Sequence, residues 1–136
     1  MPPRFLGRTE DWPARAEASL ALARMCAPGV VSEDLCFQAQ QSAENAMKAV
    51  YIHRGASFPF VHDLDLLLEG VEEQGVQIPD AVDTASILTR YASETRYPGG
   101  FEPLTLEDHA EALALAEKVL EWANAEVALP RSGPST

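Results

Sequence analysis

Three side chains in this sequence could together move a proton and hold an anionic group: His62, Arg96 and Tyr97. A histidine can move a proton near neutral pH, and an arginine can hold a phosphate through its planar fork of donors. Acid–base catalysis at a phosphate needs a positioned group that transfers the proton and a cation that stabilises the charge. The three residues together provide the side-chain types for both tasks.

Each of these residues also has a structural interpretation. His62 falls where a helix is expected to begin, and a polar side chain there can cap free backbone groups. Arg96 could pair with Glu44 in the core, and Tyr97 could pack at the end of a helix. Because constellations of this kind are often structural, we favour that interpretation and keep catalysis as the alternative.

A second polar group lies in the segment 37–51, FQAQQSAENAMKAVY. Gln41, Glu44 and Lys48 recur at helical spacing and share one helix face. A Glu followed four residues later by Lys predicts a solvated salt bridge worth about 0.2–0.5 kcal/mol, with a binding site as the alternative. Gln40 falls within the apolar arc, so we expect its amide to bond another helix or a second copy. The candidate ligand- or partner-binding residues are Gln41, Glu44, Lys48, His62, Arg96 and Tyr97.

The sequence indicates no metal site and no cofactor. The glycines at 99–100 lack the lysine and the preceding strand of a phosphate-binding loop. Asp63 and Asp65 suit the first turn of a helix better than a metal site. Cys26 and Cys36 match neither a zinc site nor a CxxC pair, so we expect two reduced, buried thiols.

Length and charge exclude several classes of function. The chain has 136 residues, enough for a single domain, and a net charge of -11. No Lys or Arg occurs from residue 55 to 89, and no basic run occurs anywhere, so DNA binding is not expected. A membrane span needs roughly 18 or more apolar residues in a row, which the chain lacks. The N-terminus has no apolar core of a signal peptide, so we expect a cytoplasmic protein.

The elements that must position these residues are helices. Helical periodicity dominates, strand signals are nearly absent, and the connections are short, which predicts an all-α, antiparallel up-and-down bundle of about five helices. We expect one domain over residues 1–128 and a disordered tail rich in Pro, Ser and Gly over 129–136. The expected helices cover residues 10–25, 32–53, 62–74, 80–96 and 105–128.

Four short motifs in order resemble those of the HEPN domains, helical bundles of bacteria and archaea. The pattern Gln-Gln-x-Ala-Glu-x-x-x-Lys-Ala begins at Gln40, and His-x-Leu-x-x-Leu begins at His62. Arg-Tyr-Pro begins at Arg96, and Trp-x-x-x-Ala begins at Trp12. The motifs cover nearly the whole chain. One departure is Asn45, where many relatives carry Lys, and it removes a positive charge beside the candidate site.

The resemblance implies a homodimer packed through these helices. It also implies, for many members, a minimal nucleotidyltransferase encoded alongside as the partner in a toxin–antitoxin pair. Some branches are metal-independent ribonucleases with an Arg, four to six residues, and then a His. No Arg here has a His at that spacing, since seven residues separate Arg54 from His62 and twelve separate Arg96 from His109.

Three hypotheses follow. The first is a non-catalytic HEPN interaction module that forms a homodimer and binds a cognate nucleotidyltransferase, a nucleotide or both. The second is a metal-independent RNase toxin that uses Arg96, Tyr97 and His62. The third is a structural dimerisation domain whose polar stripe serves the interface. The net charge of -11 favours the first and third, because RNA binding needs clustered cations.

Overall fold

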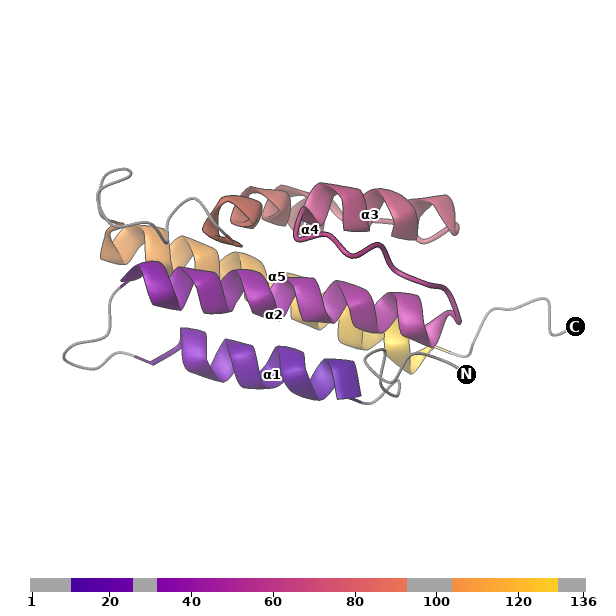
Figure 1. Cartoon of the computed structure of the whole chain (residues 1–136), viewed down its shortest axis with the longest axis horizontal. Helices are drawn as coiled ribbons and strands as arrows, with labels where there is room; N and C mark the ends of the chain where they lie inside the picture. The colour runs from indigo at the N-terminus through magenta and orange to yellow at the C-terminus, as the bar shows by residue number, and fades with distance from the viewer. Residues whose placement is uncertain (1–10, 26–31, 93–103, 130–136) are drawn as a thin grey trace, which may run out of the picture.

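The computed structural model describes residues 11–25, 32–92 and 104–129, and within them it is all-α (Figure 1). The predicted helical bundle is confirmed for this part of the chain, which contains no strand. The elements are α1 (Asp11–Ala23), α2 (Ser32–His53), α3 (Leu64–Glu73), α4 (Asp80–Asp83), the 3₁₀ helix η2 (Thr84–Ala92) and α5 (Leu106–Ala128).

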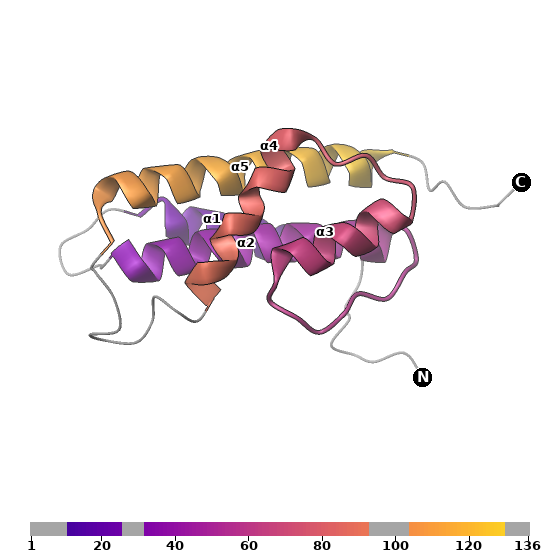
Figure 2. The same cartoon turned by 90° about the horizontal axis from the view of Figure 1, so that it is seen from above.

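Helix α2 is the centre of the molecule and is buried on nearly every side. It contacts α1, α3, η2 and α5, with α1 on one side and α3 on the opposite side (Figures 1 and 2). Its many alanines let the neighbouring helices approach closely. Its buried residues are Leu35, Cys36, Ala39, Gln40, Ser42, Ala43, Glu44, Asn45, Ala46, Met47, Ala49, Val50 and Tyr51.

The two longest helices run in the same direction. Near their beginnings the backbone N–H of Leu104 donates to Oε2 of Glu33 at 3.0 Å, and near their ends Nε2 of His53 lies 2.9 Å from the carbonyl of Leu129. Helix α1 runs opposite to both, as expected for antiparallel neighbours (Figure 1).

A return segment, residues 54–63, sets the direction of α3. Gly55, with φ 72°, ends α2 in the left-handed region that favours glycine, and the chain then runs back along α2. Helix α3 therefore starts beside the middle of α2 and runs parallel to it. At its far end Nη2 of Arg54 donates to the carbonyl of Gln74 at 2.7 Å.

The expected start of the third helix at His62 is wrong by two residues. The helix begins at Leu64, and the cap is Asp63, whose Oδ1 accepts a hydrogen bond from the N–H of Asp65 at 2.9 Å. His62 is therefore left in the return segment with its ring available for another partner.

The segment expected as one α-helix over 80–96 is a single α-helical turn followed by a 3₁₀ helix. Its buried residues are Val82, Ala85, Leu88 and Tyr91, each three residues after the last. A 3₁₀ helix has three residues per turn, so this spacing keeps all four on one side, whereas an α-helix would rotate them apart. The expected part beyond Ala92 lies outside the described residues.

Helix α5 begins with a capping box at its expected start, Thr105. Thr105 Oγ1 accepts from the N–H of Asp108 at 3.1 Å, and Asp108 Oδ2 accepts from the N–H of Thr105 at 2.9 Å. His109 is buried and hydrogen-bonds the carbonyl of Ala23. That carbonyl is one of the free groups at the end of α1, so the ring ties α1 to α5.

Candidate functional site

The Glu44–Lys48 pair is buried, so the prediction of a solvated salt bridge is wrong. Lys48 Nζ lies 2.8 Å from Oε2 of Glu44, and the two side chains are 11% and 4% exposed. The return segment 54–63 lies over this face of α2 and excludes water from it. A buried ion pair is stable only with good geometry and additional hydrogen bonds, because its two charges have lost their hydration.

The other carboxylate oxygen of Glu44 receives two more side-chain donors. Gln40 Nε2 and His62 Nδ1 each lie 3.0 Å from Oε1. Burial by itself raises the pKa of the Glu44 carboxyl, but the hydrogen bonds from its three donors outweigh burial and hold the pKa below the ordinary value. Glu44 is therefore an ionised carboxylate at neutral pH.

Gln40 extends this cluster and fixes the return segment. Its Nε2 also lies 3.3 Å from the backbone carbonyl of His62, and its Oε1 accepts from Nε2 of Gln41 at 2.7 Å. The amide expected to bond another helix or a second copy thus bonds residues of its own helix and of the return segment. His62 is held through both its ring and its backbone.

Aromatic rings enclose the Lys48 ammonium on its other side. Nζ lies 4.9 Å from the centre of the Phe58 ring and 5.9 Å from that of Trp12, and these two rings pack edge to face. Contacts of this kind stabilise a cation by about 0.5–2 kcal/mol, more as water is removed. The ammonium therefore has a carboxylate on one side and two ring faces on the other.

The polar stripe of α2 does not form a free dimerisation surface. Glu44 and Tyr51 are buried, and Phe37, Gln41 and Lys48 are partly covered. The hydroxyl of Tyr51 donates to the carbonyl of Leu67 in α3 at 2.7 Å. From Glu44 to Tyr51 the stripe faces its own return segment and α3.

His62 is the exposed end of this polar cluster, with 71% of its side chain exposed. Because the ionised carboxylate of Glu44 can only accept, Nδ1 of His62 must carry the hydrogen. Neutral His62 then presents the lone pair of Nε2 toward the solvent, where it can accept a proton or a hydrogen bond from a ligand.

Four of the six candidate residues are brought together: Gln41, Glu44, Lys48 and His62. Arg96 and Tyr97 lie outside the described residues, as do Cys26 and the segment 130–136 of the expected tail. The candidate set omitted Gln40, although its polar position inside an apolar arc was the available signal. It also omitted Trp12 and Phe58, whose contacts with Lys48 form only when α1 and the return segment pack against α2, so neither residue carries a local signal.

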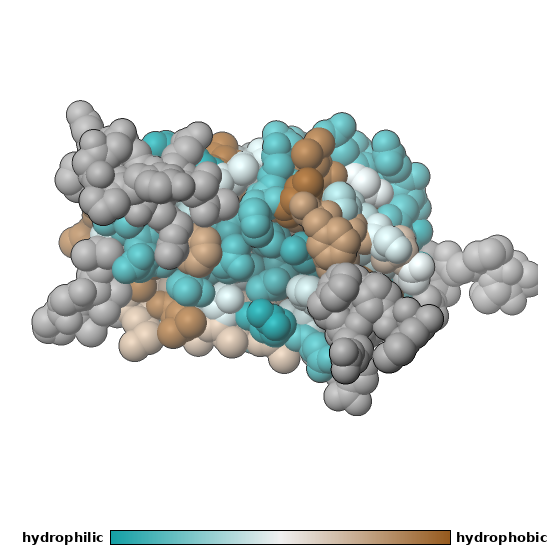
Figure 3. Space-filling view, in the orientation of Figure 1, coloured by the Kyte–Doolittle hydropathy of each residue, from teal (hydrophilic) through white to brown (hydrophobic). Residues whose placement is uncertain are grey.

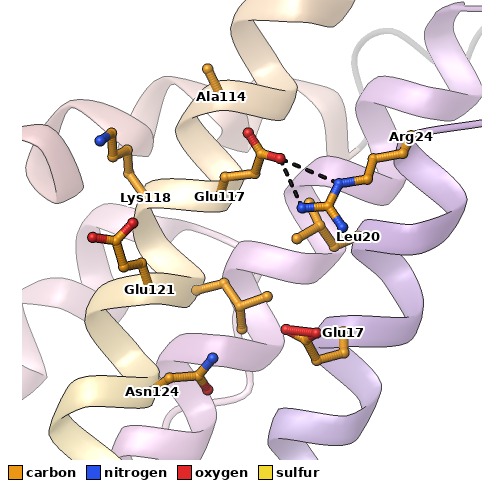
Figure 4. Close-up of a pocket in the computed structure, with 9 residues that line it drawn as sticks. Glu17, Leu20, Arg24, Ala114, Glu117, Lys118, Glu121 and Asn124 are labelled. Atoms are coloured by element: carbon orange, nitrogen blue, oxygen red, sulfur yellow. Dashed lines mark hydrogen bonds and ion pairs between the residues drawn. The ribbon is translucent and has the colours of Figure 1, made fainter.

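Two grooves lie away from the polar cluster. One, of about 510 Å³, runs between α1 and α5, where Arg24 bridges to Glu117 at 2.8 Å (Figure 4). The other, of about 460 Å³, lies between the return segment and α3. Among the described residues, no group of three His, Cys, Asp or Glu side chains could hold a metal ion. Within the same ranges, no helix has both the length and the apolar character to cross a membrane.

Comparison with known proteins identifies the family of this chain. The model of the HEPN domain family matches residues 9–126. The crystal structure of TT1696 from Thermus thermophilus is similar, with a TM-score of 0.78 and 31% identity over 88% of this chain and 98% of that one. ST0689, an archaeal HEPN homologue, has a TM-score of 0.72 and 28% identity over the same shares. No curated protein matches. The chain belongs to the HEPN domain family.

Proposed function

We propose that this chain is a non-catalytic interaction module that forms a homodimer and binds a cognate nucleotidyltransferase, a nucleotide or both. The observation that carries the proposal is the exposed His62 ring, held at Nδ1 by a buried carboxylate with three side-chain donors. In this proposal His62 contacts the ligand. The residues beneath it, Gln40, Glu44 and Lys48, fix its position and its tautomer.

The cost of this arrangement supports a functional role. Burying a carboxylate and an ammonium requires desolvation, and an apolar pair of similar volume is often as stable or more so. Nothing in the core requires a charged network that ends in an exposed imidazole. Titratable groups with perturbed environments gather at functional sites, which favours such a role here.

The charge of the chain supports a protein partner or a single nucleotide over a long RNA. The net charge is -11, and the return segment and α3 contain one cation, Arg54, which is engaged with Gln74. Polynucleotide binding depends on many phosphate contacts from clustered Lys and Arg. A single phosphate group needs only a few donors, and we propose that Arg96 and Tyr97 join His62 in providing them.

Affinity purification from the organism that encodes the chain tests the proposal. The tagged wild type, His62→Ala and the surface control Gln77→Ala are purified in parallel, and co-purifying proteins and nucleotides are identified by mass spectrometry. We expect the wild type and Gln77→Ala to retain a nucleotidyltransferase or a nucleotide, and His62→Ala to lose it. Equal recovery of that partner or nucleotide with all three chains, or from none of them, would contradict the proposal.

A ribonuclease remains the second candidate, because a histidine oriented by a carboxylate is the arrangement of a general base. The Arg and His spacing of the nuclease branch is absent, so we expect no cleavage. The assay incubates total RNA with the wild type, His62→Ala and Arg96→Ala. A contaminating nuclease would cut equally in all three preparations, whereas cleavage by the wild type alone would replace the first proposal with this one.

A further inference from the structure

The outer face of α1 is apolar and is covered by no other element of the described chain. Ala14, Ala18 and Ala21 are exposed, Leu22 is 46% exposed, and Met25, just after the helix, is 50% exposed. At 3.6 residues per turn these five positions fall within roughly 100° of the helix circumference. Figure 3 shows the corresponding row of apolar surface along the lower edge of the molecule, over α1.

We infer that this apolar face of α1 binds the α1 helix of a second copy of the chain, in antiparallel orientation about a two-fold axis near Ala21. The inference rests on the homodimer of the proposed function and gives it an interface. This face of α1 takes the place of the polar stripe of α2 as the expected dimer interface, because the return segment and α3 cover that stripe from Glu44 to Tyr51. The choice of occupant follows from side-chain size and from charge.

Side-chain size along the face favours an antiparallel self-contact. After Asp11, which begins the helix, the first half of the face carries only alanines, Ala14 and Ala18, and the second half carries the larger Leu22 and Met25. In an antiparallel pair the large side chains of each helix lie over the alanines of the other, so both halves fill. In a parallel pair Leu22 and Met25 would meet their own copies, and the alanines would leave a gap.

Charge on one flank of the face favours the same orientation. Glu17 and Arg24 lie on the flank that borders the groove between α1 and α5 (Figure 4). They are seven residues apart, about 10.5 Å along the helix. About an axis near Ala21, Glu17 of each copy lies beside Arg24 of the other, forming two equivalent pairs. In a parallel pair about a two-fold axis, this flank of one copy would lie on the opposite side of the interface from the same flank of the other copy, so Glu17 and Arg24 would not meet across it.

Both flanking charges remain able to make this contact. Glu17 has no ion-pair partner among the described residues. Arg24 is 52% exposed and uses Nε and Nη2 on one oxygen of Glu117, which leaves donors of the guanidinium for a second carboxylate. The Arg24–Glu117 pair would then form part of a charge network across the two copies.

The size of the surface sets the expected affinity. Helix α1 has 13 residues, about 20 Å, so two such helices cover less than the roughly 1,200–2,000 Å² of a tight interface unless α5 contributes. We therefore expect a dissociation constant in the micromolar range. Light scattering should find dimers near 200 µM and a growing share of monomers below about 10 µM.

The first test compares two substitutions of equally exposed leucines. Leu22→Glu places a charge in the centre of the proposed interface, and Leu66→Glu places one on α3, where the side chain is 47% exposed. We expect Leu22→Glu to be monomeric at about 200 µM and Leu66→Glu to remain dimeric. A dimer that survives Leu22→Glu, or that is lost equally in both variants, would overturn the inference.

The second test reverses the flanking charges. Glu17→Arg and Arg24→Glu should each weaken self-association, because each places like charges side by side twice. An equimolar mixture of the two variants should form a heterodimer, since every pair is then attractive. Glu117→Ala removes the pair within the chain and should leave the dimer in place. A mixture no more dimeric than either variant alone would contradict the antiparallel arrangement.

These outcomes separate the inference from the proposed function. If the wild type is monomeric at about 200 µM, both the interface inferred here and the homodimer of the proposed function are wrong. If the dimer persists in Leu22→Glu, only the inferred interface is wrong. Binding of the nucleotidyltransferase or nucleotide is measured separately with His62→Ala.

Discussion

His62 Nδ1 lies 3.0 Å from Oε1 of Glu44, although 71% of the histidine side chain is exposed and only 4% of the glutamate side chain is. The imidazole thus connects the surface to a charge in the core. The contact depends on the return segment, which brings residue 62 back beside the middle of α2. Had α3 followed α2 as an antiparallel hairpin, His62 would lie at the far end of α2.

The central role of Glu44 predicts a large loss of stability when its charge is removed. Glu44→Gln keeps the shape of the side chain but leaves the Lys48 ammonium, only 11% exposed, without its carboxylate. Breaking a buried pair from one side costs about 3–5 kcal/mol, and we expect about 3 here because the aromatic rings remain. Urea denaturation measures the change. The control Glu69→Gln, at an exposed position, should alter stability by no more than about 0.5 kcal/mol.

The same carboxylate should make the stability of the fold depend on pH in the acidic range. The pKa of Glu44 in the folded chain lies below its ordinary value of 4.5, because the hydrogen bonds outweigh the effect of burial. The unfolded chain therefore binds the proton first as the pH falls. The stabilisation is fully present above about pH 4.5 and is lost as the pH falls through the lower, folded pKa. The difference in melting temperature between the wild type and Glu44→Gln should be constant at neutral pH and shrink below pH 4.5. A difference unchanged down to acid unfolding would show that the charge is not responsible.

Local signals in the sequence were sufficient for the helices and their ends. Ser32 and Thr105 mark the starts of the two long helices, as predicted, and the Thr105–Asp108 capping box forms with both hydrogen bonds. These features depend on residues within four positions of one another, and a sequence displays such relations directly. The apolar arc of α2 likewise predicted the burial of Gln40.

The features that the sequence did not reveal depend on distant residues. The Glu44–Lys48 spacing is the same in a solvated pair and in a buried one, and only the return of the segment 54–63 decides between them. The 3₁₀ helix was missed for another reason. The buried spacing of three from Val82 to Tyr91 was visible, but three is also compatible with an α-helix over one or two turns.

Cys36 should be inert in the folded protein. It is fully buried, and burial, together with the neighbouring carboxylates of Asp108 and Glu33, raises its pKa to about 12. Since the thiolate is the reactive form, a thiol reagent should not label it at pH 8. The experiment uses Cys26→Ser, so that Cys36 is the single thiol. We expect full labelling in denaturant and none without it. Rapid labelling of the native variant would show that the core opens around α2.

Gly70 should tolerate no larger side chain while Tyr51 keeps its hydroxyl. A Cβ at Gly70 would overlap the Tyr51 hydroxyl and lie 3.0 Å from its Cζ. Within a helix the change from glycine to alanine would normally stabilise by about 1 kcal/mol. Here the overlap displaces the hydroxyl from the carbonyl of Leu67, 2.7 Å away, and leaves buried polar groups unpaired. Unpaired groups and overpacking each cost about 1–3 kcal/mol, so we expect Gly70→Ala to be destabilising overall.

A double substitution separates the overlap at Gly70 from any general effect on α3. Tyr51→Phe removes the hydroxyl that the new Cβ would meet, and the closest remaining ring atom lies 3.0 Å away. In the Tyr51→Phe background, Gly70→Ala should therefore cost little or become stabilising, because the helix propensity of alanine is then the larger effect. Thermal unfolding of the wild type, both single variants and the double variant gives the coupling between the two sites. Additive effects would show that the hydroxyl does not limit position 70, and that the close approach of α3 to α2 is set elsewhere.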